Sequence, residues 1–107
     1  MSDIMGTITM CRRAGKLQMG MDMMKDSCVN GIAKGVLVAD NISEKSLKEV
    51  KFVCKKYNVP IYSLGISMDE VGIKLGKKIG ICSVCDKGFM KKIGSVLEEI
   101  QNDTEIL

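Results

Sequence analysis

The residues best suited to chemistry lie between positions 71 and 80, where three glycines and three lysines alternate with apolar residues. Glycine has no Cβ, so its backbone N–H can approach a ligand closely. Ammonium groups beside it neutralise phosphates without reading any particular base. We therefore expect a site for a polyanion, with RNA as the first candidate. The alternative is that Gly76 ends a helix and the lysines form a solvated turn.

Cys82 and Cys85 have the spacing of half a zinc site or of a redox pair. Successive side chains on a strand point to opposite faces, so these two sulfurs would diverge. A second pair does not follow in the sequence. The remaining cysteines occupy apolar helical positions, where free cysteine acts as a small buried hydrophobe: Cys11, Cys28 and Cys54. The sequence predicts no metal, no cofactor and no disulfide.

Catalysis has few candidate groups in this chain. Histidine, the commonest general base, does not occur. Asp40, Asp86 and Lys87 follow predicted strands, where α/β proteins often place functional groups, but Asp86 is more simply explained as a helix cap. No base, nucleophile and oxyanion site stand out together. We expect no catalytic residues and a protein that is not an enzyme.

Composition indicates one globular domain over residues 1–107. The formal net charge of +3 is small, so any RNA site must be a local patch. Basic residues cluster at positions 12–16, 45–56 and 74–78. The sequence contains no run of about 18 apolar residues, the length needed to span a membrane. Its acidic first residues do not resemble a secretion signal. We expect a cytoplasmic protein with reduced cysteines and no membrane partner.

Hydrophobic periodicity and capping residues predict alternating helices and strands. The expected helices run from Ser2 or Asp3 to near Gly15, from Gly20 to Asn30, from Ser43 or Ser46 to Asn58, from the Ser67–Glu70 capping box to Leu75, and from Asp86 with Ile100 facing inward. The expected strands are Val36–Ala39, Ile61–Gly65 and Ile79–Val84, the first of them central. This alternation favours an α/β sandwich, and handedness rules favour parallel neighbours in its sheet.

Several separated motifs resemble one family. They are Ala14-Gly15-Lys16-Leu17 with Gly20, Val36 to Asp40, Tyr57 to Pro60, Val71-Gly72 with Gly76-Lys77, and Asp86 to Phe89. Over about Ala14 to Ile93 the chain resembles ribosomal proteins of the L-seven-Ae and L-thirty-e type, most of all their small bacterial YlxQ-like members. The resemblance implies a three-layer α/β/α sandwich with a small mixed sheet of about four strands. It also implies kink-turn RNA binding, with ribosomal RNA and other ribosomal proteins as candidate partners.

In that family, RNA lies against the start of the second helix and the loop before the last core strand. The resemblance therefore implies an RNA-binding set of Lys16, Gly20, Asp22 and Lys25 at the first element and Glu70, Val71, Gly72 and Lys74 at the second.

The helix motif of the strongest kink-turn binders is Gly-x-Asn-Glu-x-x-Lys, and this chain matches it only at Gly20. Asp22, Met23 and Asp26 stand where Asn, Glu and Lys are expected. An ionised aspartate cannot donate a hydrogen bond and repels phosphate. Lys25 lies one residue from the lysine position and so points about 100° away. We expect phosphate contacts, which position RNA without reading its sequence, to outweigh base readout.

A protein-interaction module is the alternative. Nine methionines are many for a short chain, and those between Met19 and Met24 could form an adaptable apolar surface. Met23 lies off the main apolar stripe of its helix, so we expect it to be exposed. Structured RNA recovered from cells would favour the first function, and protein partners without RNA would favour the second.

Overall fold

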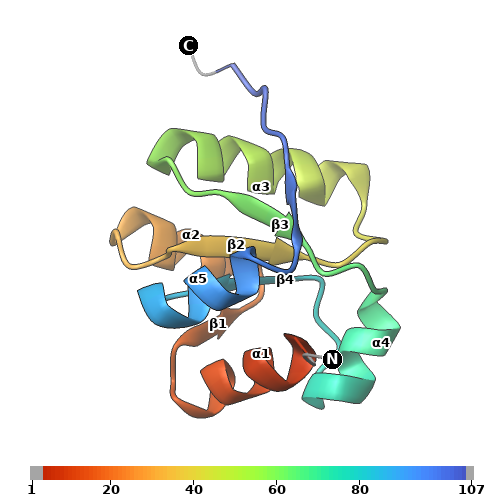
Figure 1. Ribbon diagram of the computed structural model, residues 1–107. Helices are drawn as coiled ribbons and strands as arrows, with labels where there is room; N and C mark the ends of the chain where they lie inside the picture. The colour runs from red at the N-terminus through yellow and green to blue at the C-terminus, as the bar shows by residue number, and fades with distance from the viewer. Residues whose placement is uncertain (1–3, 106–107) are drawn as a thin grey trace.

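The computed structural model describes residues 4–105, which form five helices and five strands (Figure 1). The helices are α1 (Ile4–Arg13), α2 (Met21–Val29), α3 (Glu44–Tyr57), α4 (Met68–Leu75) and α5 (Lys87–Gly94). The strands are β1 (Leu17–Met19), β2 (Gly35–Val38), β3 (Ile61–Ser63), β4 (Ile81–Val84) and β5 (Glu98–Ile100). None of the helices in this part of the chain is long and apolar enough to cross a bilayer.

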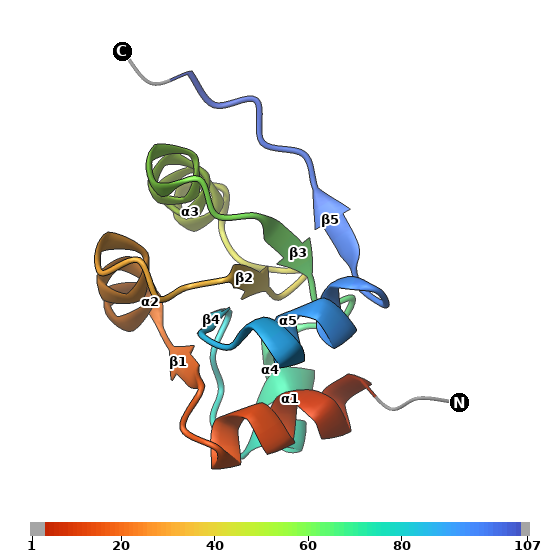
Figure 2. The same cartoon turned by 60° about the vertical axis from the view of Figure 1, so that its left-hand side comes forward.

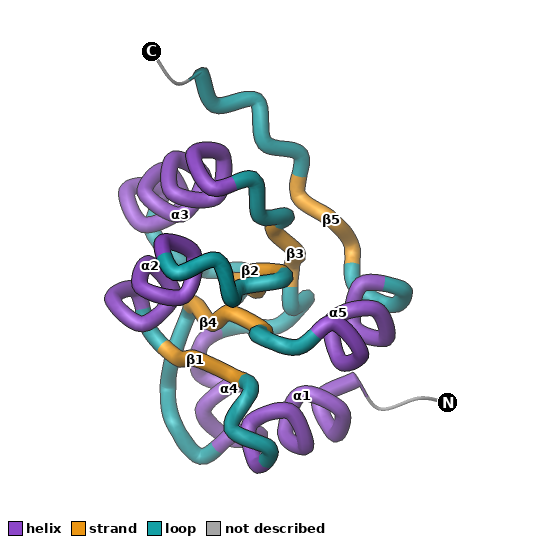
Figure 3. The backbone as a smooth tube through the Cα atoms, turned by 90° about the vertical axis from the view of Figure 1, so that its left-hand side faces the viewer, coloured by secondary structure: helices purple, strands orange, loops and turns teal. Residues whose placement is uncertain are grey.

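The elements form three layers. Helices α2 and α3 cover one face of the sheet, and α1, α4 and α5 cover the other (Figures 2 and 3). Alternating side chains of β2 supply both interfaces, because Leu37 packs with α1, α4 and α5 while Val36 and Val38 pack with α2 and α3. A strand with apolar residues on both faces needs this double cover. The predicted α/β/α sandwich is confirmed.

The sheet is mixed, with strand order β1-β4-β2-β3-β5 over the described residues. The prediction that β2 is central is confirmed. Only the β2–β3 pair is parallel in this sheet, so the expectation of parallel neighbours is wrong for its other pairs. About four strands were expected, and five are found. The additional edge strands, β1 and β5, have three residues each, too few to show a period of two in the sequence.

The last helix is shorter than predicted. It ends at Gly94 with Ser95 as its C-cap, and residues 98–100 form β5 against β3 instead of a helical turn. Glycine is a poor helix former, and pairing with β3 sets Ile100 opposite Ile61. Val96, within the segment predicted to be helical, is 50% exposed. Asp86 caps this helix as predicted, through a bond from the Phe89 N–H. The proposed caps Ser2 and Asp3 lie outside the described residues.

Candidate nucleic-acid interface

The fold brings together the start of α2 and the loop before β4, which are about 60 residues apart in sequence. Strands β1 and β4 pair antiparallel, with Met19 opposite Cys82. One residue further along, the Gly20 N–H donates a 2.8 Å hydrogen bond to the Ile81 carbonyl. We call this end of the sheet, from Gly20 to the loop Gly76–Gly80, the rim. Two separated candidate elements therefore share one edge.

Backbone geometry at the start of α2 requires glycine. Gly20 is the N-cap, with φ 97° and ψ 164°, a region that only glycine readily adopts. It has no side chain, so no side-chain hydrogen bond closes the first turn. The first N–H groups of a helix carry partial positive charge and suit an anion. Asp22, exposed in the same turn, places a carboxylate where it stabilises the helix dipole and opposes a phosphate.

The remaining side chains of α2 differ from the sequence expectation in one respect. Lys25 forms an ion pair with Glu49 of α3, with side-chain exposures of 38% and 40%. Its ammonium is thus partly neutralised and directed toward α3. Met23 is 47% exposed, as expected, and Asp26 is exposed. The outer surface of the first two turns of α2 is therefore apolar and acidic.

The second element is mostly helix, since α4 extends through Leu75 and the loop comprises only residues 76–80. Ser67 and Glu70 form the predicted capping box, which occupies the Glu70 carboxylate at the N-terminus of α4. Val71 is 0% exposed and belongs to the core, so its side chain is not available to RNA. A Cβ on Gly72 would lie 3.3 Å from the Lys78 Cα. Gly72 thus serves close packing of the loop against α4.

The C-terminal end of α4 presents exposed groups of the kind RNA contacts require. Lys74 and Lys77 are exposed, and Ile73 is 83% exposed. Gly76 ends the helix in the left-handed region, at φ 78° and ψ 5°. Lys78 pairs with Asp69 at 2.9 Å. Sequence reasoning missed Ile73, although the i, i+4 spacing of the buried Val71 and Leu75 puts it on the outer face.

Arg12 of α1 also contributes at this end. Its Nη1 donates to the Leu75 carbonyl in the last turn of α4. A cation there offsets the negative end of the helix dipole and fixes α1 against α4. The Arg12 guanidinium is thus engaged in holding the scaffold.

Lys16 lies away from the rim. It precedes β1, and its carbonyl accepts a 2.8 Å hydrogen bond from the Cys85 N–H at the far end of β4. Gly20 follows the opposite end of β1, about 13 Å away at the usual rise of a strand. Of the predicted residues, Gly20 and Asp22 lie by the Ile81 end of β4 and Gly72 and Lys74 lie in α4, the helix before that strand, whereas Lys16 belongs to the other end of the sheet.

The Cys82–Cys85 pair does not converge on a common point. Cys82 is buried with the α1, α4 and α5 residues, and burial raises the pKa of its thiol to about 12. The Cys85 Sγ lies 3.9 Å from the Ser83 Oγ. Ser83 follows Cys82 on β4, so its side chain is on the face of the strand opposite to Cys82. A protonated buried thiol is a poor nucleophile and metal ligand. Among residues 4–105, no three His, Cys, Asp or Glu side chains group as a metal site would require.

Comparison with known proteins identifies the family to which this fold belongs. The model of the ribosomal protein L7Ae/L30e/S12e/Gadd45 family matches residues 2–93. The chain belongs to this family. Members similar to it include the RNA-binding protein YlxQ of Enterococcus faecium, 35% identical over 88% of this chain and 90% of that protein. The RNA-binding protein YlxQ of Bacillus subtilis (strain 168) is 32% identical over 83% of this chain and 89% of that protein.

A solved structure supports the fold of this family member. The structure of a protein of unknown function from Bacillus halodurans C superposes with a TM-score of 0.80. The match covers 89% of this chain and 96% of that one at 21% identity. It supports the same arrangement of layers.

Proposed function

We propose that this family member is a non-enzymatic RNA-binding protein that docks structured RNA against the rim. The hydrogen bond from the Gly20 N–H to the Ile81 carbonyl carries the proposal, because it holds the open start of α2 beside the loop that follows α4. The relatives at 35% and 32% identity are named RNA-binding proteins. Lys74 and Lys77 supply the phosphate contacts, and Gly20 allows close approach of the backbone.

A kink-turn is the RNA class we propose, with ribosomal RNA as its source in the cytoplasm. A sharp bend brings phosphates of two stems close together, and the rim offers two adjacent elements for them. Lys25 and the α2 carboxylates contribute little to base readout, since Lys25 is paired with Glu49 and Asp22 cannot donate when ionised. Phosphate contacts should therefore contribute more to binding than base readout does.

Binding to a kink-turn hairpin tests this proposal. The control is the same hairpin with its sheared G·A pairs replaced by Watson–Crick pairs, titrated at several salt concentrations. We expect both RNAs to bind with a marked salt dependence and the kink-turn to bind somewhat more tightly. Absence of binding to either RNA in dilute buffer would refute the proposal. Crosslinking and sequencing of RNA bound in cells identifies the natural target.

A protein-interaction role is the second candidate. The observation that favours it is the exposure of two large apolar side chains on the helices next to the rim, Met23 of α2 at 47% and Ile73 of α4 at 83%. Adaptable methionine surfaces suit protein partners. Recovery of protein partners without RNA from cells would favour this function over the first.

A further inference from the structure

The outer face of α3 is distinct from the rim and has an unusual composition. Phe52 is 48% exposed, and helical spacing puts four exposed lysines within one turn or two of it on the same side. They are Lys45, Lys48, Lys55 and Lys56. The opposite side of α3 holds Val50, Val53 and Cys54 in the core. A single aromatic ring thus lies at the centre of a positively charged helical face.

Phe52 gives the fold only part of what a buried ring would give. Burying a phenylalanine contributes about 1.5–3 kcal/mol, and about half of this is forgone at Phe52 because 48% of its surface stays in solvent. The chain has only four Phe and Tyr residues, and the two that are exposed, Phe52 and Tyr57, both lie on α3. The Lys56 Nζ already lies 5.5 Å from the centroid of the Tyr57 ring. Aromatic rings and ammonium groups are therefore concentrated on one helix.

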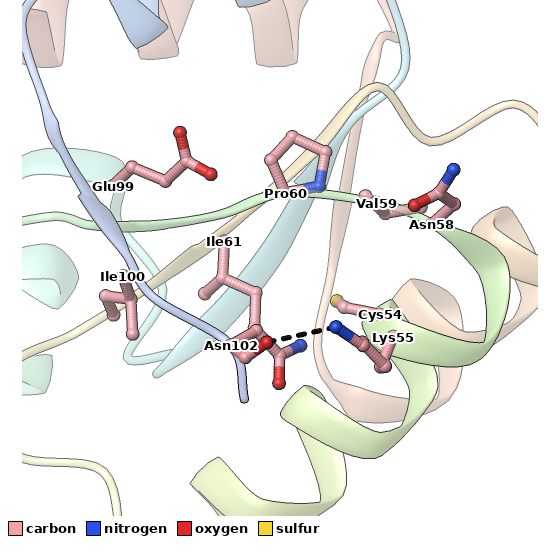
Figure 4. Close-up of a pocket in the computed structure, with 9 residues that line it drawn as sticks. All are labelled: Cys54, Lys55, Asn58, Val59, Pro60, Ile61, Glu99, Ile100 and Asn102. Atoms are coloured by element: carbon pink, nitrogen blue, oxygen red, sulfur yellow. Dashed lines mark hydrogen bonds between the residues drawn. The ribbon is translucent and has the colours of Figure 1, made fainter. Parts of the chain in front are cut away.

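Neighbouring elements border this face without covering it. On one side, Glu49 pairs with Lys25 of α2, which removes a negative charge from the edge of the face. On the other, Asn102 of the C-terminal segment donates through Nδ2 to the Lys51 carbonyl at 2.9 Å. The Lys55 Nζ donates to the Asn102 carbonyl at 3.3 Å (Figure 4). Within the described residues, Lys45, Lys48 and Lys56 have no ion-pair partner.

Unpaired RNA fits this combination. Lysines neutralise phosphates, but an aromatic ring adds affinity only if a base can stack on it, which requires a base outside a duplex. Five residues separate the end of β2 from α3, which is about 21 Å long at 1.5 Å per residue. Phe52 therefore lies about 12 Å from the start of the helix. We propose that the outer face of α3 is a second RNA-binding surface, which holds unpaired nucleotides leaving the structured RNA that, under the proposed function, docks at the rim.

A tailed hairpin tests this surface. The probes are the kink-turn hairpin alone, the same hairpin with an unpaired oligoadenosine tail of about ten nucleotides, and the free tail. We expect the tail to tighten binding about fivefold or more and Phe52→Ala to remove most of that gain, since one stacked base accounts for a factor of this size. Phe52→Tyr should retain it. Because about half of the Phe52 side chain is already exposed, both variants should remain folded, with a modest loss of thermal stability for Phe52→Ala that thermal unfolding measures.

Charge variants separate this surface from general attraction. Replacing Lys45, Lys48 and Lys56 with Gln should reduce the salt slope for the tailed RNA by about 2, at about 0.7 per single-strand phosphate. The control makes the same charge change on α5, at Lys87, Lys91 and Lys92, on the opposite face of the sheet. Equal losses in the two triple variants, or a tail effect unchanged by Phe52→Ala, would overturn the proposal. Failure of the tailless hairpin to bind, with Phe52-dependent binding of the free tail, would refute docking at the rim and leave the α3 surface supported.

Discussion

The two elements of the rim have similar backbone roles but opposite side-chain chemistry. At the start of α2, Gly20 keeps the backbone open, while the exposed side chains beside it are acidic or apolar and Lys25 is paired. At the end of α4, Gly76 sets the turn and exposed lysines follow. Backbone geometry is fixed by dihedral angles and hydrogen bonds, whereas exposed side chains can change at little cost in stability. The backbone of the rim can therefore be kept while the side chains of one of its two elements change.

Glycine substitutions should separate the two halves by stability, and this is the largest effect we expect. Gly20→Ala should lower the free energy of unfolding by about 1–3 kcal/mol, because its φ and ψ fall in a region almost confined to glycine. Gly76→Ala should cost about 1 kcal/mol, since the left-handed region is only moderately unfavourable. Gly76→Asn, a residue tolerated there, is the control. Denaturant unfolding measures all three, and equal losses at the two glycines would contradict the comparison.

Restoring the family's polar residues on α2 should sharpen its readout. The triple change Asp22→Asn, Met23→Glu and Asp26→Lys should raise the preference for a kink-turn over its Watson–Crick control by about tenfold, because a good base contact contributes about 1–3 kcal/mol. Asp26→Lys alone is the matched control, which should tighten binding of both RNAs equally. The ratio of the two dissociation constants is the readout. A ratio that does not move would show that the start of α2 no longer reads bases.

Much of the fold was predictable because its helix ends carry local signals. The Ser67–Glu70 box, the Asp86 cap and the Gly76 stop each depend on a few adjacent residues, and all are found in the structure. The edge strands were not predictable, because three-residue strands form only when a neighbouring strand fixes their register. Their residues carry too little periodicity to be recognised alone.

The site was predictable at the level of elements but less so for side chains. The family resemblance selected Gly20 and the loop before β4 as two RNA-contacting elements, and the Gly20–Ile81 hydrogen bond holds them beside each other. Grouping Lys16 with Gly20 overlooked β1, which separates them. The ion pair between Lys25 and Glu49 depends on how α2 and α3 pack, which no local pattern encodes. The exposure of Ile73 could have been found from the helical phase of Val71 and Leu75.

Equal charge reversals at Lys74 and Lys16 compare the rim with the opposite end of the sheet. Lys74→Glu should weaken binding of both hairpins and reduce the salt slope by about 1, because it removes a phosphate contact. Lys16→Glu should have a smaller effect, since about 13 Å of β1 separates it from Gly20 and the screening length is about 10 Å at 0.1 M salt. Salt titrations of both variants provide the measurement. A larger slope change for Lys16→Glu would move the site to the other end.

The smallest effect comes from releasing a lysine in each half. Glu49→Gln should free Lys25 and tighten RNA binding by about twofold, and the loss of a solvent-accessible ion pair should cost less than about 1 kcal/mol in unfolding. Asp69→Asn is the counterpart on α4, where Lys78 and Asp69 are already 64% and 75% exposed. Solvent screens that pair, so its release should change affinity less. If Asp69→Asn tightened RNA binding more than Glu49→Gln, the Lys78–Asp69 pair would be what limits RNA binding at α4. The weak contribution of α2 to binding would then not be due to the Lys25–Glu49 pair.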